Sequence, residues 1–114
     1  MPSFKIDVQT ALVFVSVAPE YKVVNRETGE IAIDRETKAK MKTVGLTICD
    51  DGNADTLTVS VPESGVPEFV AVGTPVAVTA LRARDWERVI GGEQRHGITF
   101  RAMAITPLTA PAQG

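Results

Sequence analysis

The sequence contains only one cysteine, Cys49, and one histidine, His96, among its 114 residues. A single cysteine excludes a disulfide within the chain and fits a reducing compartment. One residue of each kind also gives little support to a zinc site or a nucleophilic Cys–His pair. No apolar run reaches the about 18–20 residues of a membrane-spanning helix, and residues 1–5 lack the apolar core of a signal peptide. We therefore expect a cytoplasmic protein.

Sequence motifs typical of catalysis are also missing. The chain has no Walker-type phosphate loop and no dinucleotide-binding fingerprint. Asp50, Asp51 and Asp55 do not have the spacing of an EF-hand calcium loop. The run from Asp50 to Asn53 is better interpreted as a turn. We expect a binding domain with no catalytic residues, no metal and no cofactor.

Short runs of alternating apolar and polar residues dominate the chain, and neither helical periodicity nor an internal repeat is sustained. The alternation predicts strands near residues 4–17, 38–49, 57–61, 76–81 and 98–105. About five principal strands separated by turn signals are typical of a small barrel or sandwich. We expect a single domain over residues 1–107 and a disordered, uncharged tail over residues 108–114.

Two of the predicted connections are long. The first is a polar wing between strands one and two, with a hairpin turn near residues 25–30. The second is a polar loop over residues 82–97, between strands four and five. In barrels of the oligonucleotide-binding (OB) type, these two loops flank the ligand face. The sequence therefore predicts an all-β, five-stranded, OB-like barrel with a long wing and a long last loop.

The net charge of −2 excludes a protein that coats nucleic acid by bulk charge alone. Eleven of the twelve lysines and arginines nevertheless fall in the wing and in or beside the last loop. The two segments would converge on one side of an OB-like barrel and form a basic groove for phosphates. Lys38, Lys40 and Lys42 share one parity, which predicts that they point the same way from one strand. The same parity continues through Val44, Leu46 and Ile48, so one face of this strand is predicted to change from lysine to aliphatic. Both segments also carry acidic residues, so the alternative is a mixed-charge surface that only aids solubility.

Phe4, Phe14 and Phe100 lie in apolar alternation and are predicted to be core residues. Trp86 and Tyr21 differ because each lies in a charged context beside a basic segment. Either ring can stack on an unpaired base, which stabilises binding by about 1–3 kcal/mol. The alternatives are that Trp86 caps the barrel and that Tyr21 packs at its edge. The candidate nucleic-acid-binding residues are Tyr21, Arg35, Lys38, Lys40, Lys42, Arg82, Arg84, Trp86, Arg88 and Arg95.

Several short motifs resemble small proteins of actinobacterial integrative and conjugative plasmids. They are Thr28-Gly29-Glu30, residues 34–37, 43–46 and 54–62, Gly73-Thr74-Pro75-Val76, Trp86-Glu87 and residues 97–102. Those proteins are in turn similar to the helix-destabilising protein of filamentous phages, a dimeric five-stranded barrel. The resemblance implies a homodimer that binds single-stranded DNA, or alternatively RNA, without sequence preference during replication or conjugative transfer. The competing interpretation is a non-enzymatic protein-interaction or assembly module of the same fold.

Overall fold

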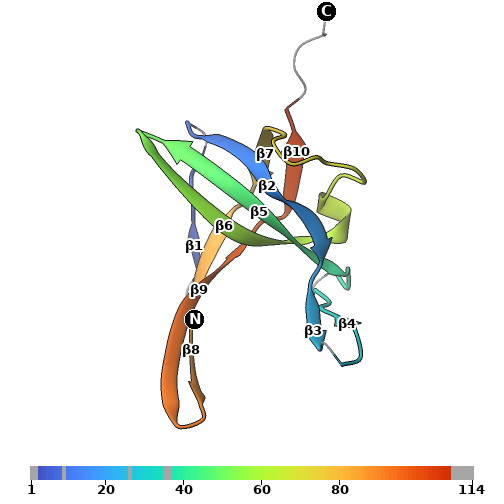
Figure 1. Cartoon of the computed structure of the whole chain (residues 1–114), viewed down its shortest axis with the longest axis vertical. Coiled ribbons are helices and arrows are strands. Elements are labelled where there is room, and N and C mark those ends of the chain that lie inside the picture. The colour runs from blue at the N-terminus through green and yellow to red at the C-terminus, as the bar shows by residue number, and fades with distance from the viewer. Residues whose placement is uncertain (1–2, 9, 26, 35–36, 109–114) are drawn as a thin grey trace, which may run out of the picture.

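The computed structural model describes residues 3–8, 10–25, 27–34 and 37–108, and this part of the chain is all-β (Figure 1). Its one helical element is a short 3-10 helix, η1 (Glu63–Gly65). None of the described helical residues form a helix long and apolar enough to cross a membrane. The strands are β1 (Ser3–Lys5), β2 (Leu12–Tyr21), β3 (Val23–Asn25), β4 (Glu30–Ile31), β5 (Met41–Asp50), β6 (Asn53–Pro62), β7 (Val76–Thr79), β8 (Arg82–Ile90), β9 (Glu93–Arg101) and β10 (Ala104–Pro107).

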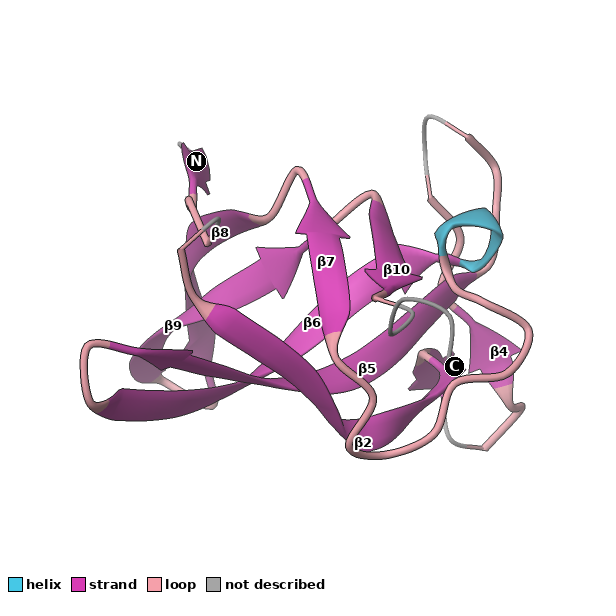
Figure 2. Cartoon of the chain, turned by 90° about the horizontal axis from the view of Figure 1, so that it is seen from above, coloured by secondary structure: helices cyan, strands magenta, loops and turns pink. Residues whose placement is uncertain are grey.

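Six of these strands form one sheet in the order β1-β8-β9-β6-β5-β2, which curls into a half-barrel (Figure 2). β6 and β9 pair in parallel, and the other neighbours in this sheet are antiparallel. β7 and β10 form a second, two-stranded sheet, and β3 and β4 form the hairpin of the predicted wing. The all-β class and the wing hairpin are therefore confirmed.

β7 continues into β8, and β9 continues into β10, as one long bent hairpin. Thr79 pairs with Ala104 and Arg82 pairs with Arg101, so both ladders keep the same register across the bend. Ala80 has a positive φ of 55° at this point, where the pairing is interrupted. The inner half of the hairpin belongs to the small sheet, and the outer half extends away from the curled sheet (Figure 1). We call the outer half, β8 with β9, the arm.

The small sheet is attached to the other edge of the half-barrel through β2. The amide of Val15 donates to the carbonyl of Thr74 at 3.0 Å, and Phe14 forms an isolated antiparallel bridge with Pro75. These contacts place strands β7 and β10 over the concave side of the large sheet. The strands enclose a core of alternating aliphatic residues, namely Val13, Val15, Val44, Leu46, Val59, Val61, Val76, Leu81, Ala102 and Ile105.

Three predictions about the strands are wrong. The first strand is two strands, β1 and β2, and β2 continues past residue 17 with an irregular pairing register around Pro19. Phe4, predicted to be in the core, is 55% exposed because β1 pairs at the outer edge of the sheet. Residues 82–97 form strands instead of a loop, because Gly91 and Gly92 adopt positive φ angles of 60° and 84° and close a tight hairpin turn.

Leu108, the first residue of the predicted tail, is hydrogen-bonded to the small sheet. The amide of Leu108 donates to the carbonyl of Pro75 at 2.9 Å, which ties this residue to the end of the small sheet. The rest of the predicted tail, residues 109–114, lies outside the described residues.

Leu46 is completely buried in the core, whereas Leu12 in the adjacent strand is 55% exposed. We expect Leu46→Ala to lower the free energy of unfolding by about 2–5 kcal/mol, because it leaves a cavity in a packed interior. Leu12→Ala is the matched control and should change it by no more than about 0.5 kcal/mol. Urea denaturation followed by circular dichroism measures both, and equal losses would contradict the core described above.

Candidate nucleic-acid interface

The arm separates its charges between its two faces. Residues paired across an antiparallel ladder lie on the same face, and neighbours along a strand alternate. Arg84 pairs with Thr99, and Trp86 pairs with Gly97. The register also places Arg88 opposite Arg95, although the side chain of Arg88 lies outside the described structure. One face of the arm, the front face, therefore carries arginines on both sides of a tryptophan.

The opposite face of the arm carries two of its three acidic residues, whereas Glu93, next to the turn, pairs with Ile90 on the front face. Asp85 pairs with Ile98, and Glu87 pairs with His96. The sequence signal for this separation is the alternation of sign from Arg84 to Arg88, in which acidic positions fall between basic or aromatic ones. Acidic and basic residues that alternate along β8 therefore lie on opposite faces of the ribbon, because the strand is pleated.

Trp86 lies against the backbone of Gly97 on the front face. A Cβ atom at residue 97 would come within 2.7 Å of Cζ2 and 2.9 Å of Nε1 of the indole, so only glycine fits beneath this ring. Trp86 is half-buried and does not belong to the hydrophobic core. The interpretation that Trp86 caps the barrel is therefore wrong, and the contact with glycine holds the ring flat on the ribbon.

The front face of the arm continues onto the outer face of the sheet, the side away from the core. A row of paired residues crosses five strands there, running from Lys5 through Arg82, Arg101 and Ser60 to Thr43. The Nζ atom of Lys22 reaches the same row, since it donates to Oγ of Ser60 at 3.3 Å. Sequence reasoning missed Lys5, although its alternation with Phe4 and Ile6 was the available signal.

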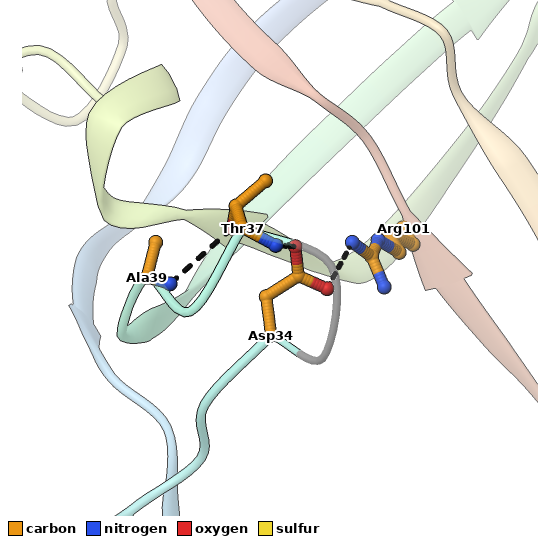
Figure 3. A network of polar contacts seen from close by, with 4 residues as sticks. All are labelled: Asp34, Thr37, Ala39 and Arg101. Carbon is orange, nitrogen blue, oxygen red and sulfur yellow. Dashed lines mark hydrogen bonds and ion pairs between the residues drawn. The ribbon is translucent and has the colours of Figure 1, made fainter.

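Arg101 connects this outer face to the wing through a buried carboxylate (Figure 3). Its guanidinium donates to Oδ1 of Asp34 at 2.5 Å, and the hydroxyl of Thr37 donates to Oδ2 at 2.7 Å. The hydrogen bonds from Thr37 and then from Arg101 lower the pKa of Asp34 from 3.8 to about 2. Asp34 is buried, whereas the Arg101 side chain is half-exposed. The ion pair therefore fixes the wing while leaving part of the guanidinium accessible.

Tyr21 organises a second basic cluster. The Nζ atoms of Lys42 and Lys40 lie 4.8 and 5.8 Å from the centroid of its ring. Its hydroxyl donates to Oε1 of Glu63 at 2.6 Å. This hydrogen bond, followed by burial and by the negative charge of Glu63, raises the pKa of Tyr21 above 10.0. We call Tyr21, Lys40, Lys42 and Glu63 the rim cluster.

The structure does not bring the rim cluster and the front face of the arm together. Lys42 pairs with Tyr21 and Val61, and it shares its parity with the buried Val44 and Leu46. The prediction that this face changes from lysine to aliphatic along β5 is thus confirmed. The same parity places Lys42 on the opposite side of β5 from the row that contains Arg101.

The prediction that three lysines project from one strand is wrong. β5 begins at Met41, and Lys38 lies in a turn with a positive φ of 63°. The amide of Lys38 donates to the carbonyl of Asp34 at 2.8 Å, so the turn closes on the same residue that binds Arg101. Arg35, another predicted contact, lies outside the described residues.

A cavity of about 380 Å³ lies beside the tip of the β5–β6 hairpin, away from both basic clusters. Its apolar lining includes Ile6 and Leu57, and its polar lining includes Asp50, Asn53 and Asp55. Its acidic rim makes it unsuitable for a polyanion. Within the described ranges, no group of three or more His, Cys, Asp or Glu residues is placed to hold a metal ion.

Comparisons with protein-family models, with curated proteins and with solved structures find no match to this chain. The candidate interface is therefore defined by the geometry of its own residues.

The Asp34 ion pair predicts a pH dependence of stability. Because the folded pKa is depressed, the stabilisation is complete above the ordinary value near 3.8 and is lost as the pH falls towards about 2. We expect Asp34→Asn to destabilise the protein at pH 6 and the difference from the unmodified chain to shrink across this acidic range. Chemical denaturation at a series of pH values tests this. A difference that does not vary with pH would contradict the ion pair.

The contact between Trp86 and Gly97 predicts the effect of adding a methyl group. Gly97→Ala should push the indole off the ribbon and lower the free energy of unfolding by about 1–3 kcal/mol, because the added Cβ overpacks the contact. The emission of the single tryptophan should shift to longer wavelength as its exposure to water increases. Thr99→Ala, on the same face of the same strand, is the control and should leave the emission unchanged.

Proposed function

We propose that this chain is a single-stranded DNA-binding protein without sequence preference. The strand binds along the front face of the arm and continues onto the outer face of the sheet. The observation that supports this most directly is the separation of charge around Trp86, where arginines flank the ring on one face of the arm and Asp85 and Glu87 occupy the other. RNA, which offers the same phosphates and unpaired bases, is the alternative ligand.

Electrostatics favour this surface over the rest of the molecule. Arg84 is exposed, and no carboxylate is paired with it among the described contacts. Arg95 forms an ion pair with Glu93 at 3.6 Å, but both side chains are well exposed, so this pair contributes little. Guanidinium groups along a ribbon neutralise successive phosphates and release their counterions. Local binding of this kind is compatible with the net charge of −2.

The shape of the surface favours a single strand. Trp86 offers a flat ring between arginines, and base–aromatic stacking tolerates any sequence. The outer face beside it carries small hydroxyl residues, among them Thr58, Ser60 and Thr99. Small side chains leave space for a backbone to approach the sheet. A duplex reader needs an element that enters a groove, and no recognition helix occurs in the part of the chain that the structure describes.

We also propose that the half-barrel belongs to a closed barrel of the OB type, and the strand order supports this. β2, β5 and β6 form an antiparallel meander, and β6 pairs in parallel with β9. The segment before β7 then meets the free edge of β2 at Phe14 and Pro75. In this interpretation β7–β8 and β9–β10 are the fourth and fifth barrel strands, and the bridge at Phe14 closes the barrel.

The biological process and the assembly follow from the sequence resemblance and stay predictions. They are replication or conjugative transfer of a mobile element, carried out in the cytoplasm by a homodimer. A protein-interaction module of the same fold would use the arm only as a solvated surface. The experiment below separates these two functions.

The test is a fluorescence titration of Trp86 with oligo-dT at several salt concentrations, with duplex DNA as the comparison. We expect quenching by the single strand that weakens steeply with salt. Arg84→Gln should weaken binding and reduce the slope of log K against log[salt] by about 0.7, the value for one phosphate contact on a single strand. An unchanged emission with both nucleic acids at low salt would contradict the proposal and favour the interaction module.

Glu87→Gln provides a matched control on the opposite face of the arm. It changes the net charge by the same amount as Arg84→Gln, with the opposite sign. If the front face binds the strand, the Glu87 variant should keep the salt slope of the unmodified protein. Equal and opposite effects of the two variants would show that net charge, and not the front face, controls binding.

A further inference from the structure

The rim cluster is a basic site that the arm surface does not use. Two ammonium groups lie within 5.8 Å of the centroid of one tyrosine ring, and neither has a carboxylate partner among the described contacts. The carboxylate of Glu63 accepts a hydrogen bond from the hydroxyl of Tyr21 instead. The ring therefore gathers two positive charges at one place, and its own orientation is fixed by the hydrogen bond to Glu63.

The pairing pattern determines which side of the sheet this cluster faces. Lys42 is in register with Tyr21 on β2 and with Val61 on β6. The next residue along β5, Thr43, is in register with Ser60, which pairs with Arg101. Successive residues of a strand point to opposite faces. The rim cluster and the Arg101 row are therefore separated by the thickness of the sheet.

The chemistry of the rim cluster suits a phosphodiester group. Lysine ammonium groups bind phosphate as point charges, without the fixed geometry that a specific base contact needs. A short single strand that lies on the arm cannot also reach the far side of β5 without bending around the sheet. A second segment of nucleic acid meets no such restriction.

We propose that the rim cluster is a second polyanion site, so that one molecule holds two segments of single-stranded nucleic acid on opposite faces of its sheet. This inference rests on the proposed function of the arm. It adds an activity, the bridging of strands, that a single continuous groove would not have.

The experiment is a bridging assay with two short oligo-dT samples, one carrying a donor dye and the other an acceptor. Oligonucleotides of about eight nucleotides match the site size of one OB domain. We expect the unmodified protein to bring donor and acceptor together and produce energy transfer. The double variant Lys40→Gln, Lys42→Gln should lower this transfer to the level that the arms of a homodimer produce by themselves, and it should keep the Trp86 quenching and its dissociation constant.

Two further variants test whether a loss of energy transfer results from removal of the rim cluster or from an unrelated effect on charge or folding. Lys38→Asn removes a neighbouring charge outside the rim cluster, at a left-handed position that asparagine tolerates, and it should keep the energy transfer. Glu63→Gln removes the negative charge from the cluster and should increase the transfer. A gain of function in this variant cannot result from misfolding.

The outcomes separate the two proposals. Trp86 quenching without energy transfer in the unmodified protein would overturn the second site and leave the arm surface intact. Energy transfer that is undiminished in the Lys40, Lys42 double variant would also overturn it, because bridging would then arise only from the arms of associated protein copies. Absence of both quenching and transfer would overturn the proposed function together with this inference.

Discussion

The uninterrupted register of two antiparallel ladders is the constraint on which the rest of the structure depends. β5 and β6 pair without a bulge from Met41 to Asp50, and β8 and β9 pair without a bulge from Arg82 to Ile90. Because side chains alternate along each strand, the register decides which residues face the core and which face water. A shift by one residue would bring the acidic side of the arm onto the front face. Backbone pairing thus controls the electrostatics of a chain whose net charge is close to zero.

Much of the architecture could be predicted from hydrophobic alternation. The strand that leads from Lys42 into Val44 and Leu46 and the turn at Asp51 and Gly52 both have clear local signals. The arm could not be predicted in this way, because residues 82–97 project from the core and have no apolar face to generate the pattern. In the arm, it is the sign of the charge that alternates from one residue to the next, and a hydropathy pattern does not detect this alternation.

The candidate site was harder to predict than the fold because contacts distant in sequence determine it. The contribution of Arg101 depends on a partner 67 residues away, and that of Trp86 depends on the absence of a side chain at Gly97. Lys40 and Lys42 carry the predicted type of charge, yet pairing turns them away from the arginines they were expected to join. Composition identified the basic segments, and only the three-dimensional register assigns them to separate surfaces.

The ion pair between Asp34 and Arg101 also has a consequence for the order of folding during synthesis. Asp34 leaves the ribosome long before Arg101, and β6 must likewise wait for its parallel partner β9. Until then the meander of β2, β5 and β6 can form by local pairing, but the wing lacks the cation that holds its buried carboxylate. The closure of so long a loop is entropically costly and comes late. The wing is therefore expected to become ordered only after Arg101 has left the ribosome.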